Sequence, residues 1–375
     1  MSLCTFRTLW RKLWQTPWNG ASATVGPLVA LSLLLAGCGG GCFGLCSAAD
    51  DDDDDEIATV PVDPSSDLSC YTSSGTVARA ENIPYSQAAD ASAEQVLRYF
   101  DSGLASSTAI RPLLVWITGD TWESGTSTTD APTLARDLAE QLGANFAVVS
   151  YRQSDTAAWP AQIVDVKTAI RFMKSENVEQ NFNIDLERIY VGGDQAGATL
   201  AALTAYTGGF DDFEPTEFPN QTDEPDLLFT FGGVYNFDSV LDDNAALPAA
   251  CAGIAPNIDD LAIRRLFDCT VSDDTTNPLS QCDVDTLQLA SPIQQVGPGS
   301  PPALFYHGTL DCQIPPAQSE ELNDRYGSGG PDSILRGNGI FVALPNDDQT
   351  LASLSGTLIL EDLIGFADFD CDDNT

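Results

Sequence analysis

The sequence predicts an α/β fold in which helices cover a mostly parallel central sheet. Short apolar runs without polar alternation recur along residues 70–375, as expected of strands buried on both faces. In the first part of this region, segments with helical periodicity lie between successive apolar runs. Regular β–α–β alternation of this kind implies parallel strands. Hydrophobic residues make up 43% of the 375 residues, so the chain can build a large core and wholesale disorder is excluded.

The expected elements alternate in chain order. We expect buried strands at residues 113–117, 146–150, 189–191, 227–230, 303–306 and 339–344. Asp130 and Pro132 open a helix whose leucines repeat every four residues until Gly143 ends it. Pro160 starts a second helix with an apolar stripe. A glycine-rich turn and an alanine-rich helix over residues 195–205 follow the third strand.

Two acidic insertions interrupt this alternation, at residues 207–225 and 236–290. They are rich in Asp, Pro and Thr, and we expect them to form an irregular cap over the C-terminal edge of the sheet. An even number of cysteines in the body predicts up to three disulfides whose pairing the spacing does not reveal. These cysteines are Cys70, Cys251, Cys269, Cys282, Cys312 and Cys371.

The first 49 residues have the pattern of an export and anchoring segment. Arg7, Arg11 and Lys12 precede an uncharged stretch over residues 13–49, and its apolar run ends at Cys38. Leu35-Ala36-Gly37-Cys38 resembles the lipobox of prokaryotic lipoproteins, in which the cysteine is lipidated. The alternative is an uncleaved signal anchor that runs to about residue 46.

Both interpretations predict an exported protein of the cell envelope or cell surface, attached to the membrane through its N-terminus. The six Asp and one Glu of residues 50–56 repel one another, so residues 50–69 are expected to be a solvated tether. Residues 70–375 then form the folded domain.

The charge balance excludes several partners. The chain has 16 Lys+Arg against 55 Asp+Glu, a formal charge of −39, and phosphate backbones require basic surfaces. We therefore expect no nucleic-acid partner. The one histidine argues against a His-rich metal site, and we expect neither a metal nor a cofactor. Such an excess of carboxylate also suits a protein that stays soluble at high salt.

Four segments, in order, carry a family resemblance. They are residues 112–122 (PLLVWITGDTW), 159–172 (WPAQIVDVKTAIRF), 184–198 (IDLERIYVGGDQAGA) and 300–311 (SPPALFYHGTLD). Together they resemble an α/β-hydrolase of the carboxylesterase type, close to the hormone-sensitive-lipase and feruloyl- or acetyl-esterase-like branch. The resemblance spans residues 75–366 and implies an α/β-hydrolase fold.

The same resemblance implies where a catalytic site would lie. Gln195 occupies the nucleophile position, and its carboxamide has no hydroxyl or thiol that could attack an ester. Asp311 matches the triad acid, whereas the base position maps to residues 345–350, which hold no histidine. His307 matches a structural histidine of the family. The oxyanion hole or pocket would be formed by Thr118, Gly119, Asp120, Asp194 and Ala196.

These substitutions predict a catalytically inactive carboxylesterase-like protein that binds an unknown small ligand or protein partner. One alternative is an ester hydrolase with non-standard chemistry, in which Asp120, Asp194 and Asp311 act as acid and base. A second alternative is a disulfide-stapled structural lipoprotein of the envelope. Turnover of a simple ester distinguishes the first alternative from the other two.

Overall fold

The structure is a computed structural model that describes residues 79–100, 110–119, 121–123, 139, 144–247, 249–254, 260–270, 279–327 and 339–344. All of these residues belong to one compact unit, Thr59–Phe369. The second unit joins Met1–Ala58 and Asp370–Thr375 and lies outside the described residues. The expected export segment, Cys38 and the whole tether also lie outside the described residues, which begin at Arg79.

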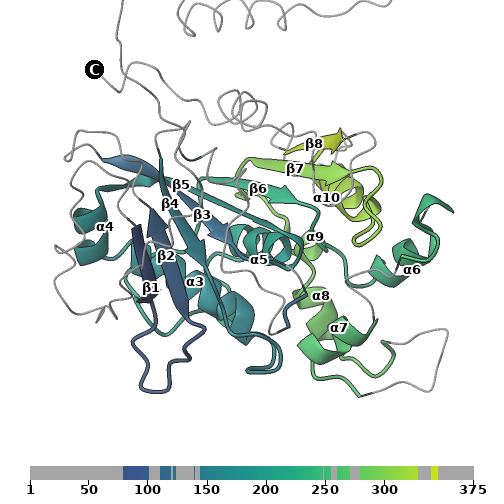
Figure 1. Cartoon of the computed structure of the whole chain (residues 1–375), viewed down its shortest axis with the longest axis horizontal. Coiled ribbons are helices and arrows are strands. Elements are labelled where there is room, and N and C mark those ends of the chain that lie inside the picture. The colour runs from purple at the N-terminus through teal and green to yellow at the C-terminus, as the bar shows by residue number, and fades with distance from the viewer. Residues whose placement is uncertain are drawn as a thin grey trace, which may run out of the picture. The chain divides into compact units, whose positions relative to one another are not determined.

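The described residues form an eight-stranded sheet in the order β1-β2-β4-β3-β5-β6-β7-β8 (Figure 1). β1 pairs with β2, and β2 with β4, in antiparallel fashion, whereas the pairs from β4 to β8 are parallel. The strands are β1 (Arg79–Pro84), β2 (Val96–Phe100), β3 (Arg111–Ile117), β4 (Asn145–Val149), β5 (Ile184–Asp194), β6 (Leu227–Phe231), β7 (Ala303–Gly308) and β8 (Gly339–Leu344). The mostly parallel α/β sheet is thus confirmed.

All six predicted strands are present, but the antiparallel pair β1 and β2 was not predicted. β1 includes Arg79, Glu81 and Pro84, so its residues show no apolar run. β2 is half-buried at Val96 and Arg98. Pairing of β2 with β4 and of β1 with β2, rather than any local preference, holds these strands in the sheet.

The helices beside the sheet are α3 (Ala161–Met173), α4 (Glu176–Phe182), α5 (Gln195–Tyr206) and α10 (Ala317–Gly327). α3 and α5 confirm the helices expected after Pro160 and at residues 195–205. Every α5 residue after Gln195 is buried, which explains its nearly continuous run of small and apolar side chains. Of the helix expected between Asp130 and Gly143, only Ala139 lies within the described residues, and it is helical.

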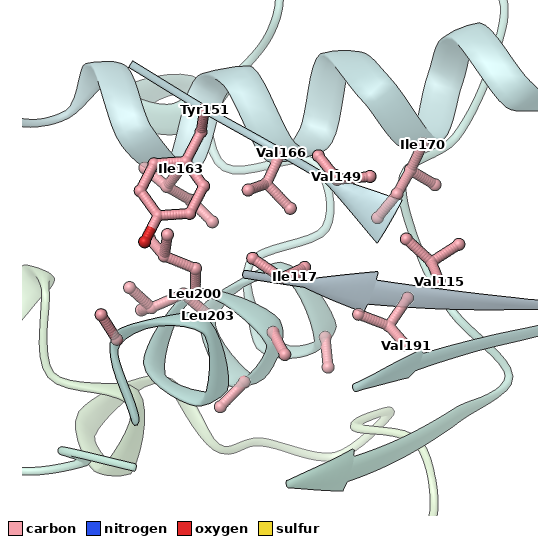
Figure 2. Packing of buried hydrophobic residues seen from close by; sticks show 14 of the residues in the cluster. Val115, Ile117, Val149, Tyr151, Ile163, Val166, Ile170, Val191, Leu200 and Leu203 are labelled. Atoms are coloured by element: carbon pink, nitrogen blue, oxygen red, sulfur yellow. The ribbon is translucent and has the colours of Figure 1, made fainter. Parts of the chain in front are cut away.

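Side chains from alternate positions of each strand form two separate cores. Val115, Ile117, Val149 and Val191 lie on the face that packs against α3 and α5 (Figure 2). Leu114, Trp116, Phe146, Val148 and Tyr190 form the core of the opposite face. Both sets are buried, which is why the strands show no polar alternation in the sequence.

Short helices make up the described parts of the two insertions. They are η2 (Asp211–Phe213), α6 (Val240–Ala245), η3 (Ala249–Cys251), α7 (Asp260–Leu266), α8 (Val284–Leu289) and, just after the second insertion, α9 (Pro292–Gln295). α6, α7 and α8 lie on the side toward which the β6 arrow points (Figure 1). Disulfides join Cys251 to Cys312 and Cys269 to Cys282, while Cys70 and Cys371 lie outside the described residues.

Candidate functional site

The most unusual backbone of the site lies where β5 turns directly into α5. β5 ends at Asp194 and α5 begins at Gln195, with no intervening loop. Gln195 has a φ of 49°, in the left-handed region that non-glycine residues rarely adopt. Its side chain is half-buried, whereas Ala196 behind it is fully buried. A strained, partly exposed residue at this turn is the geometry of a nucleophile elbow.

Two glycines allow this bend because the start of α5 lies against the end of β3. A Cβ on Gly197 would collide with the carbonyl oxygen of Ile117 and lie 2.7 Å from that of Thr118. A Cβ on Gly193 would lie 2.6 Å from the carbonyl carbon of Gly197. Real Cβ atoms do not approach other atoms so closely, so both positions require glycine. The elbow is preserved by backbone packing, whatever side chain it presents.

Three of the five residues expected to form the oxyanion hole or pocket lie together at the elbow. Gly119 contacts Asp194 so closely that a Cβ there would lie 2.5 Å from the carboxylate Oδ1. The N–H of Ala196 is in the first turn of α5, where amides have no intrahelical acceptor. Gly119, Asp194 and Ala196 therefore lie together at the elbow, and Asp120 lies outside the described residues.

Thr118 differs from this expectation. Its backbone N–H donates to the carbonyl of Val149 at 3.2 Å, and its hydroxyl donates to the same oxygen at 3.3 Å. The side chain is buried against the end of β4. Both donors of Thr118 thus bond to the sheet in this structure, and its assignment to an oxyanion hole or pocket stays a prediction.

The retained acid, Asp311, lies in the turn that follows β7, two strands away from β5 in the sheet. Its Oδ1 accepts hydrogen bonds from the amides of Gln313 at 2.8 Å and Ile314 at 3.0 Å. Its Oδ2 faces the Nε2 of His307 at 3.4 Å. The carboxylate is buried and closes its own turn, so its contacts here are those of a structural residue.

His307 is fully buried and both of its ring nitrogens have partners. Nε2 lies 3.0 Å from the carbonyl oxygen of Ile314, which can only accept, so Nε2 carries the proton. Nδ1 lies 2.7 Å from the Ser319 hydroxyl, within hydrogen-bond distance. A buried imidazole held in this way stabilises the turn and is not available as a base, which agrees with the structural role predicted for it.

Contacts between the insertion and the site were not predicted from the sequence. Trp122 of the segment after β3 packs against Phe237, and Phe237 packs against Phe267 at the end of α7, with ring centroids 6.0 and 5.1 Å apart. Arg265 of α7 pairs with Glu123 at 2.6 Å. The Cys251–Cys312 disulfide joins the insertion to the residue after Asp311. The even cysteine count signalled a bond, but only proximity in the fold identifies the partners.

Among the described residues, no group of three or more His, Cys, Asp or Glu side chains could hold a metal ion. In the same part of the chain, no helix has the length and apolar character needed to cross a bilayer.

The BD-FAE family profile matches residues 104–326, more than half of the chain. The chain belongs to the BD-FAE family. Two curated relatives come from Mycobacterium tuberculosis, and both are 28% identical to this chain. The probable carboxylic ester hydrolase LipM aligns over 58% of this chain and 45% of its own length. Esterase LipC aligns over 57% of this chain and 48% of its own. The chain thus spans about half the length of these relatives.

Solved esterase structures share the fold of this BD-FAE member. A truncated carbohydrate esterase from gut microbiota has a TM-score of 0.60 at 20% identity, covering 82% of this chain and 99% of that one. Thermogutta terrifontis esterase 2, phosphonylated by sarin, has a TM-score of 0.54 at 17% identity, covering 75% and 93%. At these identities the likeness shows the fold alone, and the fold is that of a carboxylesterase-type α/β-hydrolase.

Proposed function

We propose that this chain is a non-hydrolytic BD-FAE member that binds a ligand at the β5–α5 elbow while tethered to the outside of a membrane. The observation that carries the proposal is Gln195, which has the left-handed backbone of a nucleophile elbow but offers a carboxamide in place of a nucleophile. Removing the nucleophile from such a site lowers turnover by about a million-fold.

The state of the other triad positions supports the loss of hydrolysis. The only histidine in the sequence is fixed between Ile314 and Ser319, and Asp311 closes its own turn. What remains at the elbow is a polar surface made by the half-buried Gln195 and Asp194 and the first amides of α5. Such groups can orient a neutral polar ligand by hydrogen bonds without cleaving it.

Two assays on the full-length chain in nonionic detergent test inactivity. We expect no covalent labelling by a fluorophosphonate and no turnover of p-nitrophenyl acetate above the buffer rate, with LipC assayed in parallel as a positive control. Gln195→Ser should gain little, because no base accompanies the new hydroxyl. Turnover that Asp311→Asn or Gln195→Ala abolishes would instead establish the alternative, an ester hydrolase with non-standard chemistry.

Ligand binding needs a separate test. An acetylated xyloside is a suitable first probe, because an acetyl ester-xyloside bifunctional hydrolase from Caldicellulosiruptor lactoaceticus shares the fold with a TM-score of 0.52. Calorimetry should show binding that Gln195→Ala weakens several-fold, the loss of about one hydrogen bond. Failure of this probe and of a wider panel of esters and amides, together with no partner in pull-downs, would favour a purely structural envelope protein.

The membrane attachment rests on the basic, then apolar, N-terminal segment and its lipobox-like Cys38. We expect the N-terminal peptide of the mature wild-type protein to begin at Cys38 and to carry an acyl mass, and Cys38→Ser to lose both the acyl mass and the cleavage. A wild-type protein that retains residues 1–37 and carries no acyl mass at Cys38 would establish the uncleaved anchor instead.

A further inference from the structure

Three cations are buried in and just after α3, although the protein is strongly acidic. The only lysines after residue 12 are Lys167 in α3 and Lys174 directly after it, and both are buried. Their amino groups donate to the carbonyl oxygens of Thr207 at 2.6 Å and Glu224 at 2.7 Å. Arg171, between them, is also buried and pairs with Asp223 and Glu214. These three cations form a seam that attaches the first insertion to α3.

The surface formed by α6, α10 and the residues just before α6 carries exposed acidic side chains instead of buried basic ones. Asp238, Asp242, Glu320 and Asp324 are exposed, and within the described part of the chain none of them forms an ion pair. Arg325 is the one basic residue in either helix. α6 and α10 contact each other, and Gln318 and Glu321 of α10 bond to Asp243 of α6 and to Ser239 just before it, so the four carboxylates belong to one region of the surface. We call these four acidic residues the acidic face.

Like charges on a compact domain repel one another, and the salt concentration sets the distance over which this repulsion acts. The screening length falls from about 30 Å at 10 mM salt to about 3 Å at 1 M. With a formal charge of −39, carboxylates across the whole domain interact at low salt but only immediate neighbours do at high salt. The buried seam is shielded from ions and keeps its strength at both extremes.

We propose that folding of this protein depends on ionic strength, with the acidic face as a salt-sensitive element and the α3 seam as a salt-independent one. Monovalent salt should stabilise the folded state by screening the acidic face. At low salt the α6–α10 region should open before the segment held by Arg171 and Lys167. This inference does not depend on the ligand or on the absence of hydrolysis.

The experiment is a set of thermal melts of the full-length chain in nonionic detergent at 10 mM, 150 mM and 1 M KCl. We expect Tm to rise by roughly 5 °C or more across this range. The variant D242N/E320Q/D324N should raise Tm at 10 mM KCl and reduce the salt-dependent rise. Arg325→Gln should do the reverse, lowering Tm at 10 mM KCl and leaving it unchanged at 1 M.

Sucrose provides the control, because it stabilises compact states without screening charges. Wild type and the neutralised variant should therefore respond equally to sucrose and differently to KCl. A wild-type Tm that does not change with KCl would overturn the proposal. A neutralised variant with the same KCl response as wild type would also overturn it, since the acidic face would then contribute nothing.

Discussion

The elbow at Gln195 and the turn at Asp311 occupy neighbouring parts of one sheet, yet they differ from a Ser-His-Asp triad in opposite ways. The elbow keeps its backbone, with a φ of 49° and glycines at close approach, but its central side chain cannot react. The Asp311 turn keeps both an acid and a histidine, but their hydrogen bonds hold the turn together. In the elbow, close backbone packing fixes the shape independently of the central side chain.

The largest effect we predict concerns the covalent anchor of the Asp311 turn. Cys312→Ser should lower the free energy of unfolding by about 4 kcal/mol, because the bond to Cys251 closes a loop of 61 residues. Cys282→Ser, whose bond closes a separation of only 13 residues, should cost about 3 kcal/mol. Denaturant unfolding of both variants measures the difference. Equal losses would show that loop length does not govern this stabilisation.

The next prediction tests whether the elbow is held by its backbone. Gly197→Ala should cost about 3 kcal/mol, because the added methyl group meets the carbonyl oxygens of Ile117 and Thr118, which belong to the sheet. Gly297→Ala is the matched control, since its Cβ would meet nothing closer than 3.9 Å. Urea denaturation should show a near-neutral control. A harmless Gly197→Ala would mean that the elbow is looser than its packing indicates.

A pair of substitutions tests whether the hydrogen bonds of Asp311 stabilise its turn. Asp311→Ala leaves the amides of Gln313 and Ile314 without their acceptor and should cost about 2 kcal/mol. Asp311→Asn keeps an acceptor oxygen and should cost less than half as much. The free energies of unfolding of the two variants provide the measurement. Two equal losses would indicate that the charge, not the hydrogen bonding, stabilises the turn.

The smallest effect should be a gain in stability. Gln195→Gly relieves the left-handed backbone and should stabilise the protein by about 1 kcal/mol while weakening ligand binding. Asn183 at the end of α4 has a similar φ of 51°, but Asn tolerates this region. Asn183→Gly should therefore stabilise the protein by only a few tenths of a kcal/mol. If Gln195→Gly destabilises the fold, contacts of the carboxamide outweigh the strain.

Much of the fold could be predicted because local patterns carry it. Both faces of β3, β4, β6, β7 and the second half of β5 are buried, so these segments form apolar runs in the sequence, and Pro160 marks the start of α3 correctly. β1 and β2 could not be predicted, since the pairing of β1 with β2 and of β2 with β4 supplies what their residues lack. The partners of Cys251 and Cys269 depend equally on contacts between distant segments.

For the candidate site, the sequence by itself determined which side chains are present. A carboxamide at position 195 is not a nucleophile whatever the fold, because reactivity belongs to the side chain, and residues 345–350 hold no histidine. Only the tertiary structure decided how the remaining groups are used. Hydrogen bonds and close packing depend on distances between atoms far apart in the chain. Those distances assign His307 and Asp311 to their own turn, Thr118 to the sheet, and Gln195 to a strained, half-exposed elbow.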